Sequence, residues 1–146
     1  MSSYFAYGSN MSSARLLARV SGAELRGRCR LRDWRLAFNK PGRDGSGKAN
    51  LVEALGDLTW GVAWRLPDDA WPVLDRFEPG YERRVFQLTE TDGQTLQAHA
   101  YLYACPAGSP WLPPSDDYLA QLLRGALEHD LPTSYIAKIR SLRGHS

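Results

Sequence analysis

Hydrophobic and polar positions alternate most clearly between residues 60 and 66, where large apolar side chains are separated by small or charged ones. A period of two is typical of a β-strand with one buried face. Residues 25–38 show the same period with one change of parity, and a bulge or turn near Asp33 explains that change. Further strands are predicted at residues 4–7, 49–55, 82–90 and 94–103, the last two joined as a hairpin around Asp92-Gly93.

Helical periodicity is strongest after Ser115, which is a favourable N-cap residue. The apolar residues between Leu119 and Leu127 fall at i, i+3, i+4, i+7 and i+8, so they share one helix face. Residues 69–77 also carry an apolar helical face, which Glu78-Pro79-Gly80 ends. Further helices are predicted at residues 12–20 and 135–142, and loops at residues 41–48 and 106–114.

The order of these elements is mixed, with about six strands and no regular alternation of strand and helix. This order favours the α+β class, with a strongly curved and mostly antiparallel sheet. We expect the sheet to close into a small β-barrel with flanking helices. The 146 residues suit one core, so residues 1–146 are predicted to form a single domain.

Composition is that of a folded globular protein, with 43% hydrophobic and 23% charged residues. No apolar run reaches the ~18 residues that a membrane-spanning helix needs, so no membrane partner is expected. Residues 1–4 lack a basic region followed by an apolar one, which predicts no secretory signal. Cys29 and Cys105 are far apart and are interpreted as reduced thiols, which favours a cytoplasmic location.

The formal net charge is only +2, but basic residues are concentrated between Arg26 and Arg32. A basic run of this kind is found in some nucleic-acid-binding proteins. In this run, however, every second residue is an arginine, as expected for the solvated face of a strand. We favour the second interpretation and expect no nucleic-acid partner.

Residues that could hold a metal are scarce. The three histidines, His99, His129 and His145, show no metal-ligand spacing, so no metal site is expected. Neither cysteine lies beside a histidine, and no G-x-S-x-G motif occurs, so a serine or cysteine nucleophile is not indicated either.

Tyr7-Gly8-Ser9-Asn10 lies between a predicted strand and a predicted helix. A turn at this place presents several backbone N–H groups, near the positive end of the helix dipole, to a carboxylate or a developing oxyanion. Gly8 allows a tight turn, and the side chains of Ser9 and Asn10 are able to hold the loop. The alternative is an ordinary capped turn without a ligand.

Glu78 follows an apolar helical face and has Trp71, Phe77 and Tyr81 close in sequence. A carboxyl group among aromatic side chains loses hydration, and its pKa rises towards the range useful for a general base. The alternative is a solvated glutamate at the end of a helix, although a negative charge there opposes the helix dipole.

Together these segments resemble the gamma-glutamylcyclotransferase family. The resemblance spans nearly the whole chain, and the order and spacing of its blocks are more specific than any one motif. The blocks are Phe5-Ala6-Tyr7-Gly8-Ser9-Asn10-Met11 with Arg15-Leu16, Trp60-Gly61-Val62-Ala63-Trp64, Leu74-Asp75-Arg76-Phe77-Glu78, Tyr81-x-Arg83, Tyr101-Leu102 and Leu131-Pro132-x-x-Tyr135.

The resemblance implies a compact β-barrel with a cofactor-free active site. It also implies an intramolecular acyl transfer, in which the α-amino group of a γ-glutamyl unit attacks its own γ-carbonyl and releases pyroglutamate and an amine or amino acid. By the same resemblance Glu78 is the general acid/base. Substrate-binding roles are implied for Tyr7, Gly8, Ser9, Asn10, Tyr81, Tyr101 and Tyr135.

The expected partner is a small γ-glutamyl amino acid or γ-glutamylamine, and the expected assembly is a monomer or homodimer. An alternative function is a non-catalytic module on the same fold that binds a small anion or a γ-glutamyl ligand.

Overall fold

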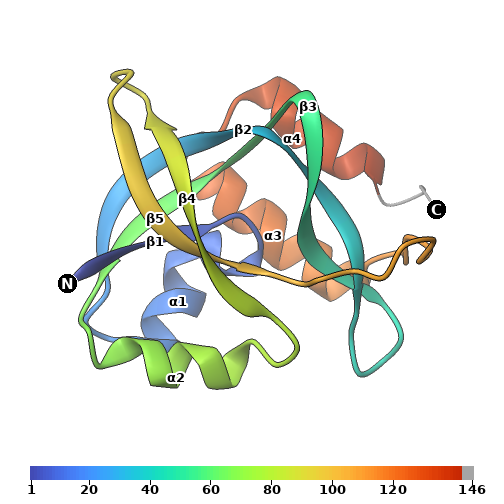
Figure 1. Ribbon diagram of the computed structural model, residues 1–146, viewed down its shortest axis with the longest axis horizontal. Helices are drawn as coiled ribbons and strands as arrows, with labels where there is room; N and C mark the ends of the chain where they lie inside the picture. Colours follow the sequence, from blue (N-terminus) through green and yellow to red (C-terminus); the bar gives the residue numbers. More distant parts are fainter. Residues whose placement is uncertain (143–146) are drawn as a thin grey trace.

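The computed structural model describes residues 1–142, so His145 lies outside the described residues. These residues form an α+β fold in which five strands make a closed barrel in the order β1-β3-β2-β4-β5 (Figure 1). The predicted α+β class and mostly antiparallel barrel are confirmed. The strands are β1 (Ser2–Ala6), β2 (Glu24–Pro41), β3 (Gly47–Leu66), β4 (Glu82–Glu90) and β5 (Thr95–Leu102).

β2 and β3 form the longest antiparallel pair, and both bend at the same place. The register shifts between Arg32 and Trp34, where Asp33 has a φ of 69°. Opposite it, Gly56 has a φ of 87° and its N–H donates to Asp33 Oδ1 at 2.9 Å. The predicted irregularity near Asp33 is therefore confirmed. It also explains why the two strands expected at 49–55 and 60–66 are one continuous strand, bent at Gly56.

β1 closes the barrel. It pairs antiparallel with β3, and on its other side Tyr4 pairs with His99 of β5 in the parallel sense. The Tyr7 hydroxyl also donates to the Tyr101 carbonyl oxygen. These contacts join the start of the chain to its second half, so the residues after β1 lie at one end of the barrel.

Helices flank the barrel, as predicted. α3 passes behind the strands beside α1, and α2 lies at the other side of α1 (Figure 1). Ser12 Oγ accepts from Arg15 N at the start of α1, and Ser115 Oγ accepts from Tyr118 N at the start of α3. The helices are η1 (Ser9–Met11), a 3₁₀ turn, then α1 (Ser13–Arg19), α2 (Ala70–Phe77), α3 (Asp116–Glu128) and α4 (Thr133–Ser141). No helix within residues 1–142 has the length and apolar character that a membrane crossing needs, and the longest, α3, has 13 residues.

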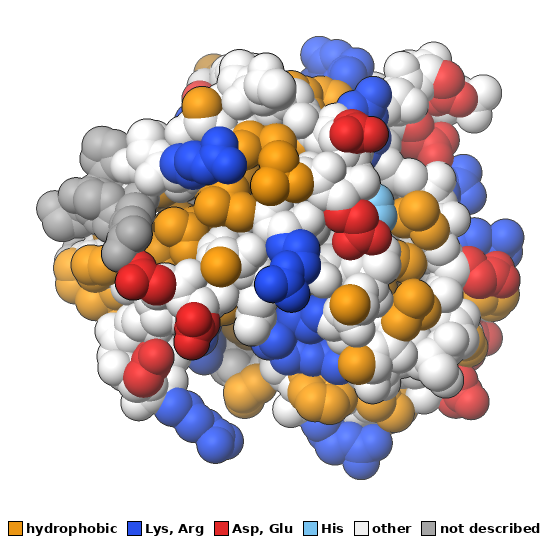
Figure 2. Space-filling model, turned by 180° about the vertical axis from the view of Figure 1, so that it is seen from behind, with side chains coloured by type: hydrophobic (Ala, Val, Ile, Leu, Met, Phe, Trp, Pro, Cys, Tyr) orange, Lys and Arg blue, Asp and Glu red, His pale blue; other side chains and the backbone are white. Residues whose placement is uncertain are grey.

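The arginine-rich part of β2 is a solvated strand face. Cys29 and Leu31 are buried, whereas Arg28 and Arg32 are exposed and Arg26 forms an ion pair with Glu90 at 2.8 Å. Figure 2 shows basic side chains spread among acidic and hydrophobic ones over the rear face, without one continuous basic surface there. Both cysteines are free thiols.

Candidate active site

A cavity of about 210 Å³ opens at the end of the barrel where the β1–η1 turn, α1, the β2–β3 hairpin and the α2–β4 connection meet. These segments are distant in sequence, so only the closed barrel brings them together. The lining residues are Tyr4, Tyr7, Gly8, Ser9, Asn10, Arg15, Arg19, Lys40, Gly42, Arg43, Lys48, Ala49, Phe77, Glu78, Pro79, Tyr81, Tyr101 and Tyr118.

Glu78 is the single acid among these lining residues. It is the residue after α2, where its N–H donates to the Asp75 carbonyl and its own carbonyl accepts from Tyr81 N. Gly80, with a φ of 85°, allows the tight turn between them. This turn directs the carboxyl group into the cavity, and the side chain is 18% exposed.

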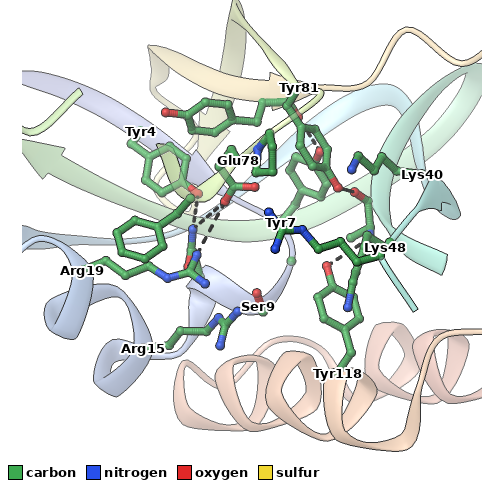
Figure 3. Close-up of a pocket in the computed structure, with 18 residues that line it drawn as sticks. Tyr4, Tyr7, Ser9, Arg15, Arg19, Lys40, Lys48, Glu78, Tyr81 and Tyr118 are labelled. Atoms are coloured by element: carbon green, nitrogen blue, oxygen red, sulfur yellow. Dashed lines mark hydrogen bonds and ion pairs between the residues drawn. The ribbon is translucent and has the colours of Figure 1, made fainter. Parts of the chain in front are cut away.

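The carboxylate of Glu78 is held by the turn that follows β1. Asn10 Nδ2 donates to Glu78 Oε1 at 3.0 Å and also lies 3.0 Å from the Tyr4 hydroxyl (Figure 3). Arg19 Nη1 donates to Asn10 Oδ1 at 3.1 Å and lies 3.8 Å from Glu78 Oε1. The Glu78 carboxylate is thus in direct contact with the candidate anion-binding turn, because the amide side chain of Asn10 belongs to that turn.

Burial raises the pKa of Glu78 to about 7, against the opposing effects of Arg19, Arg15, the hydrogen bond from Asn10 and Lys40. A carboxyl group with this pKa is populated in both protonation states near neutral pH. It is therefore able both to take a proton and to return it. Of the aromatic residues expected around it, Phe77 and Tyr81 line the cavity and Trp71 does not.

The Tyr7–Asn10 turn differs from the expectation in the role of its glycine. Gly8 has a negative φ of −116°, so a left-handed conformation does not explain the glycine. A Cβ at this position would lie 3.2 Å from Ala49 Cβ and 3.4 Å from the Tyr118 hydroxyl. Gly8 therefore allows the turn to approach β3 and α3 closely. The first N–H groups of a 3₁₀ turn have no acceptor within it, so those of η1 are suited to meet an anion.

The predicted tyrosines Tyr7, Tyr81 and Tyr101 all line the cavity. Their hydroxyl groups are anchored: Tyr81 donates to the Ala49 carbonyl at 2.6 Å, and Tyr101 donates to Asp75 Oδ1 at 2.6 Å. Burial raises the pKa of each of the three, so they are neutral at pH 7. These rings form part of the cavity wall.

Tyr135 lies elsewhere. It is a buried residue of α4 in the hydrophobic core and is not among the described residues that line the cavity. The structure thus brings together Tyr7, Gly8, Ser9, Asn10, Glu78, Tyr81 and Tyr101, but not Tyr135.

Sequence reasoning missed the cationic side chains of the cavity, which are Arg15, Arg19, Lys40, Arg43 and Lys48. The spacing of Arg15 and Arg19, four residues apart on the helix after the turn, was a usable signal. The three hairpin residues gave none, because Arg43 and Lys48 fall in a segment, residues 41–48, that reads only as a loop, and Lys40 directly precedes it. Tyr4 and Tyr118 were also missed. Within residues 1–142, no cluster of three or more His, Cys, Asp or Glu side chains has the geometry of a metal site.

Comparison with known proteins finds relatives that match most of the chain. The family model described as "Gamma-glutamyl cyclotransferase, AIG2-like" matches residues 4–120. The gamma-glutamylcyclotransferase of Bos taurus is 30% identical over 149 residues, which cover 95% of this chain and 77% of the relative. That of Mus musculus is 31% identical with the same coverage.

Solved structures show the same fold. A structure named gamma-glutamyl cyclotransferase superposes with a TM-score of 0.87 at 28% identity, over 96% of this chain and 86% of that chain. YkqA from Bacillus subtilis shares the fold, with a TM-score of 0.81 at 23% identity over 98% of this chain and 54% of that one. The chain belongs to the gamma-glutamyl cyclotransferase, AIG2-like family.

Proposed function

We propose that this chain is a gamma-glutamyl cyclotransferase, which converts a γ-glutamyl amino acid or γ-glutamylamine to pyroglutamate and a free amine. The observation that carries the proposal is the direct contact between Glu78 and Asn10 across the cavity. It places a poorly hydrated acid against the turn that carries the family's motif. The names of the relatives support the same reaction.

The proposed reaction needs one proton carrier. Glu78 takes a proton from the α-ammonium group of the substrate, and the freed nitrogen attacks the γ-carbonyl carbon. The attacking nitrogen then carries two hydrogens and the departing nitrogen one. Glu78 gives its proton to the departing nitrogen as the bond from the γ-carbonyl carbon to that nitrogen breaks, and it then carries the second proton from the ring nitrogen to the released amine, which leaves as an ammonium ion. A pKa of about 7 suits proton transfer in both directions.

The other groups of the cavity hold the substrate in the cyclising conformation. Arg15 Nε is buried and has no hydrogen-bond partner within residues 1–142, so Arg15 is available to the α-carboxylate of the γ-glutamyl unit. Backbone N–H groups of the Gly8–Asn10 turn receive the carboxylate or the oxyanion of the tetrahedral intermediate. The tyrosine rings restrict the substrate to the folded conformer, which supplies the proximity effect.

The test is pyroglutamate formation from γ-glutamyl-alanine by the purified protein, compared with the Glu78→Gln variant. The amide is nearly isosteric with the carboxyl group but is not a base, so we expect a loss of ~10²-fold or more in kcat/KM. The circular dichroism spectrum of the variant serves as the control for folding. Full activity in Glu78→Gln would refute the mechanism, and no product from any γ-glutamyl compound would refute the function.

A cytoplasmic location is part of the same proposal. It is supported by Cys29 and Cys105, which are both free thiols, as is usual in a reducing compartment.

A further inference from the structure

The cavity has two separate groups of cationic side chains. Arg15 and Arg19 come from α1, whereas Lys40, Arg43 and Lys48 come from the β2–β3 hairpin. Figure 3 shows the two hairpin lysines on the opposite side of Glu78 from the two α1 arginines. The α-carboxylate of the γ-glutamyl unit needs only one of these groups, which leaves the other for the departing group.

Most of the hairpin's positive charge is not neutralised by the protein. Within residues 1–142, none of the three hairpin cations forms an ion pair with a carboxylate. Lys40 Nζ lies 5.4 Å from the centre of the Tyr81 ring, and Lys48 Nζ lies 4.4 Å from that of Tyr118. Because both rings line the cavity, these contacts hold the two ammonium groups at its wall.

One acid belongs to the same hairpin. Asp44 accepts hydrogen bonds from Ser46 N at 3.0 Å and Ser46 Oγ at 2.6 Å, and these bonds, followed by the charge of Lys48, lower its pKa. Three cations and one acid leave residues 40–48 with a net charge of +2. This charge matches a departing group with two carboxylates rather than one.

The hairpin lies where the departing group must be. Glu78 and the buried Asn10 mark the inner part of the cavity, where the γ-glutamyl unit has to react. Arg43 is exposed and lies on the tip of the hairpin, at the opening. The group attached to the γ-carbonyl therefore extends from Glu78 towards the hairpin.

We propose that the β2–β3 hairpin selects the departing group by its negative charge. Lys40, Arg43 and Lys48 bind a departing amino acid that carries an acidic side chain, aspartate or glutamate, in preference to a neutral one of the same size. This inference rests on the proposed cyclotransferase function, and it adds to that function the residues that determine specificity.

The experiment compares γ-glutamyl-glutamate with γ-glutamyl-glutamine, which have nearly the same shape and differ by one charge. For the wild-type protein we expect kcat/KM to be about tenfold higher for the glutamate compound at low ionic strength, and the ratio to fall in about 0.5 M salt. Arg43→Gln, at an exposed hairpin tip, should lower the ratio several-fold. The triple variant K40Q/R43Q/K48Q should bring it to about one.

Arg32→Gln is the matched control, because Arg32 is an exposed arginine of β2, the strand that leads into the hairpin, and does not line the cavity. It removes the same charge from the protein and should leave the ratio unchanged. Arg43→Glu should lower the ratio further than Arg43→Gln does, because it replaces the positive charge at the hairpin tip by a negative one. A wild-type ratio near one, or a ratio that survives Arg43→Gln and the triple variant, would overturn the inference while the cyclotransferase function stands. No pyroglutamate from any of these compounds would overturn both.

Discussion

Glu78 combines two environments that oppose each other. Burial removes water from its carboxyl group and raises its pKa, whereas Arg19, Arg15 and Asn10 favour the charged form. The balance, near pH 7, keeps the group useful both as a base and as an acid. A fully paired carboxylate would be too weak a base, and an unpaired one would remain protonated.

The pH dependence of activity should report this balance. Only the ionised form of Glu78 accepts a proton, so we expect kcat/KM to fall about tenfold per pH unit below the pKa of about 7. The measurement is a pH profile of pyroglutamate release from γ-glutamyl-alanine between roughly pH 5 and pH 9. A profile that stays level down to pH 5 would contradict the assignment of Glu78 as the base.

The same shift predicts how stability changes with pH. Because the folded state binds the proton of Glu78 more tightly than the unfolded state, ionisation costs the folded state stability as pH rises from 4.5 to about 7. The cost is roughly 3 kcal/mol when complete. As pH rises from 5 to 8, we expect the free energy of unfolding of Glu78→Gln to increase relative to that of the wild type by up to that amount. Urea unfolding of both proteins at pH 5 and pH 8 measures this difference, and a difference that is the same at the two pH values would contradict the prediction.

Among the elements, the contact of α3 with η1 places the turn that holds Glu78. Gly125 on α3 lies against this turn, since a Cβ there would come within 2.6 Å of Met11 Cβ and Ser12 N. The His129 ring, at the end of the same helix, lies 2.9 Å from the Met11 carbonyl oxygen. Both contacts fix the backbone immediately after Asn10.

Gly125→Ala should therefore destabilise the protein by about 1–3 kcal/mol and lower kcat/KM, because α3 and η1 must move apart. Helix propensity alone would act in the opposite direction, by about 1 kcal/mol in favour of alanine. Urea unfolding and the pyroglutamate assay measure the two effects. Ala120→Ser, on the exposed face of α3, is the control and should change neither by much. A Gly125→Ala variant as stable as the wild type would contradict the close contact.

On the scale of the whole molecule, the cavity connects segments that only barrel closure brings together. A ligand bound there touches the start of the chain, the β2–β3 hairpin and the α2–β4 connection at once. Binding should therefore stabilise the entire fold rather than one loop.

We expect γ-glutamyl-alanine at 100 times its Kd to stabilise Glu78→Gln by about 2.7 kcal/mol, with free alanine as the control. Thermal unfolding measures the shift in Tm. The wild-type protein distinguishes the two functions considered for this fold. Stabilisation without pyroglutamate formation would support a non-catalytic binding module, and no stabilisation of either protein would count against the cavity as the binding site.

Local patterns were enough for most elements. The change of parity at Asp33 predicted the bend of β2, and the apolar period after Ser115 predicted α3, because both depend on which face of an element is buried. The pattern could not show that residues 49–55 and 60–66 form one strand. Their continuity depends on Gly56 bonding to Asp33 across the sheet, which is a contact between segments.

The chemical types needed at the site, an acid in apolar surroundings and a turn rich in backbone donors, could be inferred from Glu78 and Tyr7–Asn10 in the linear order. Their contact could not, since residues 10 and 78 meet only when β1 closes the barrel. The same holds for Lys40 and Lys48, which the folded hairpin brings to the cavity, and for Tyr135, which α4 carries into the core. Short-range periodicity records which side of an element faces the core, whereas the cavity is made by long-range packing, which no single segment encodes.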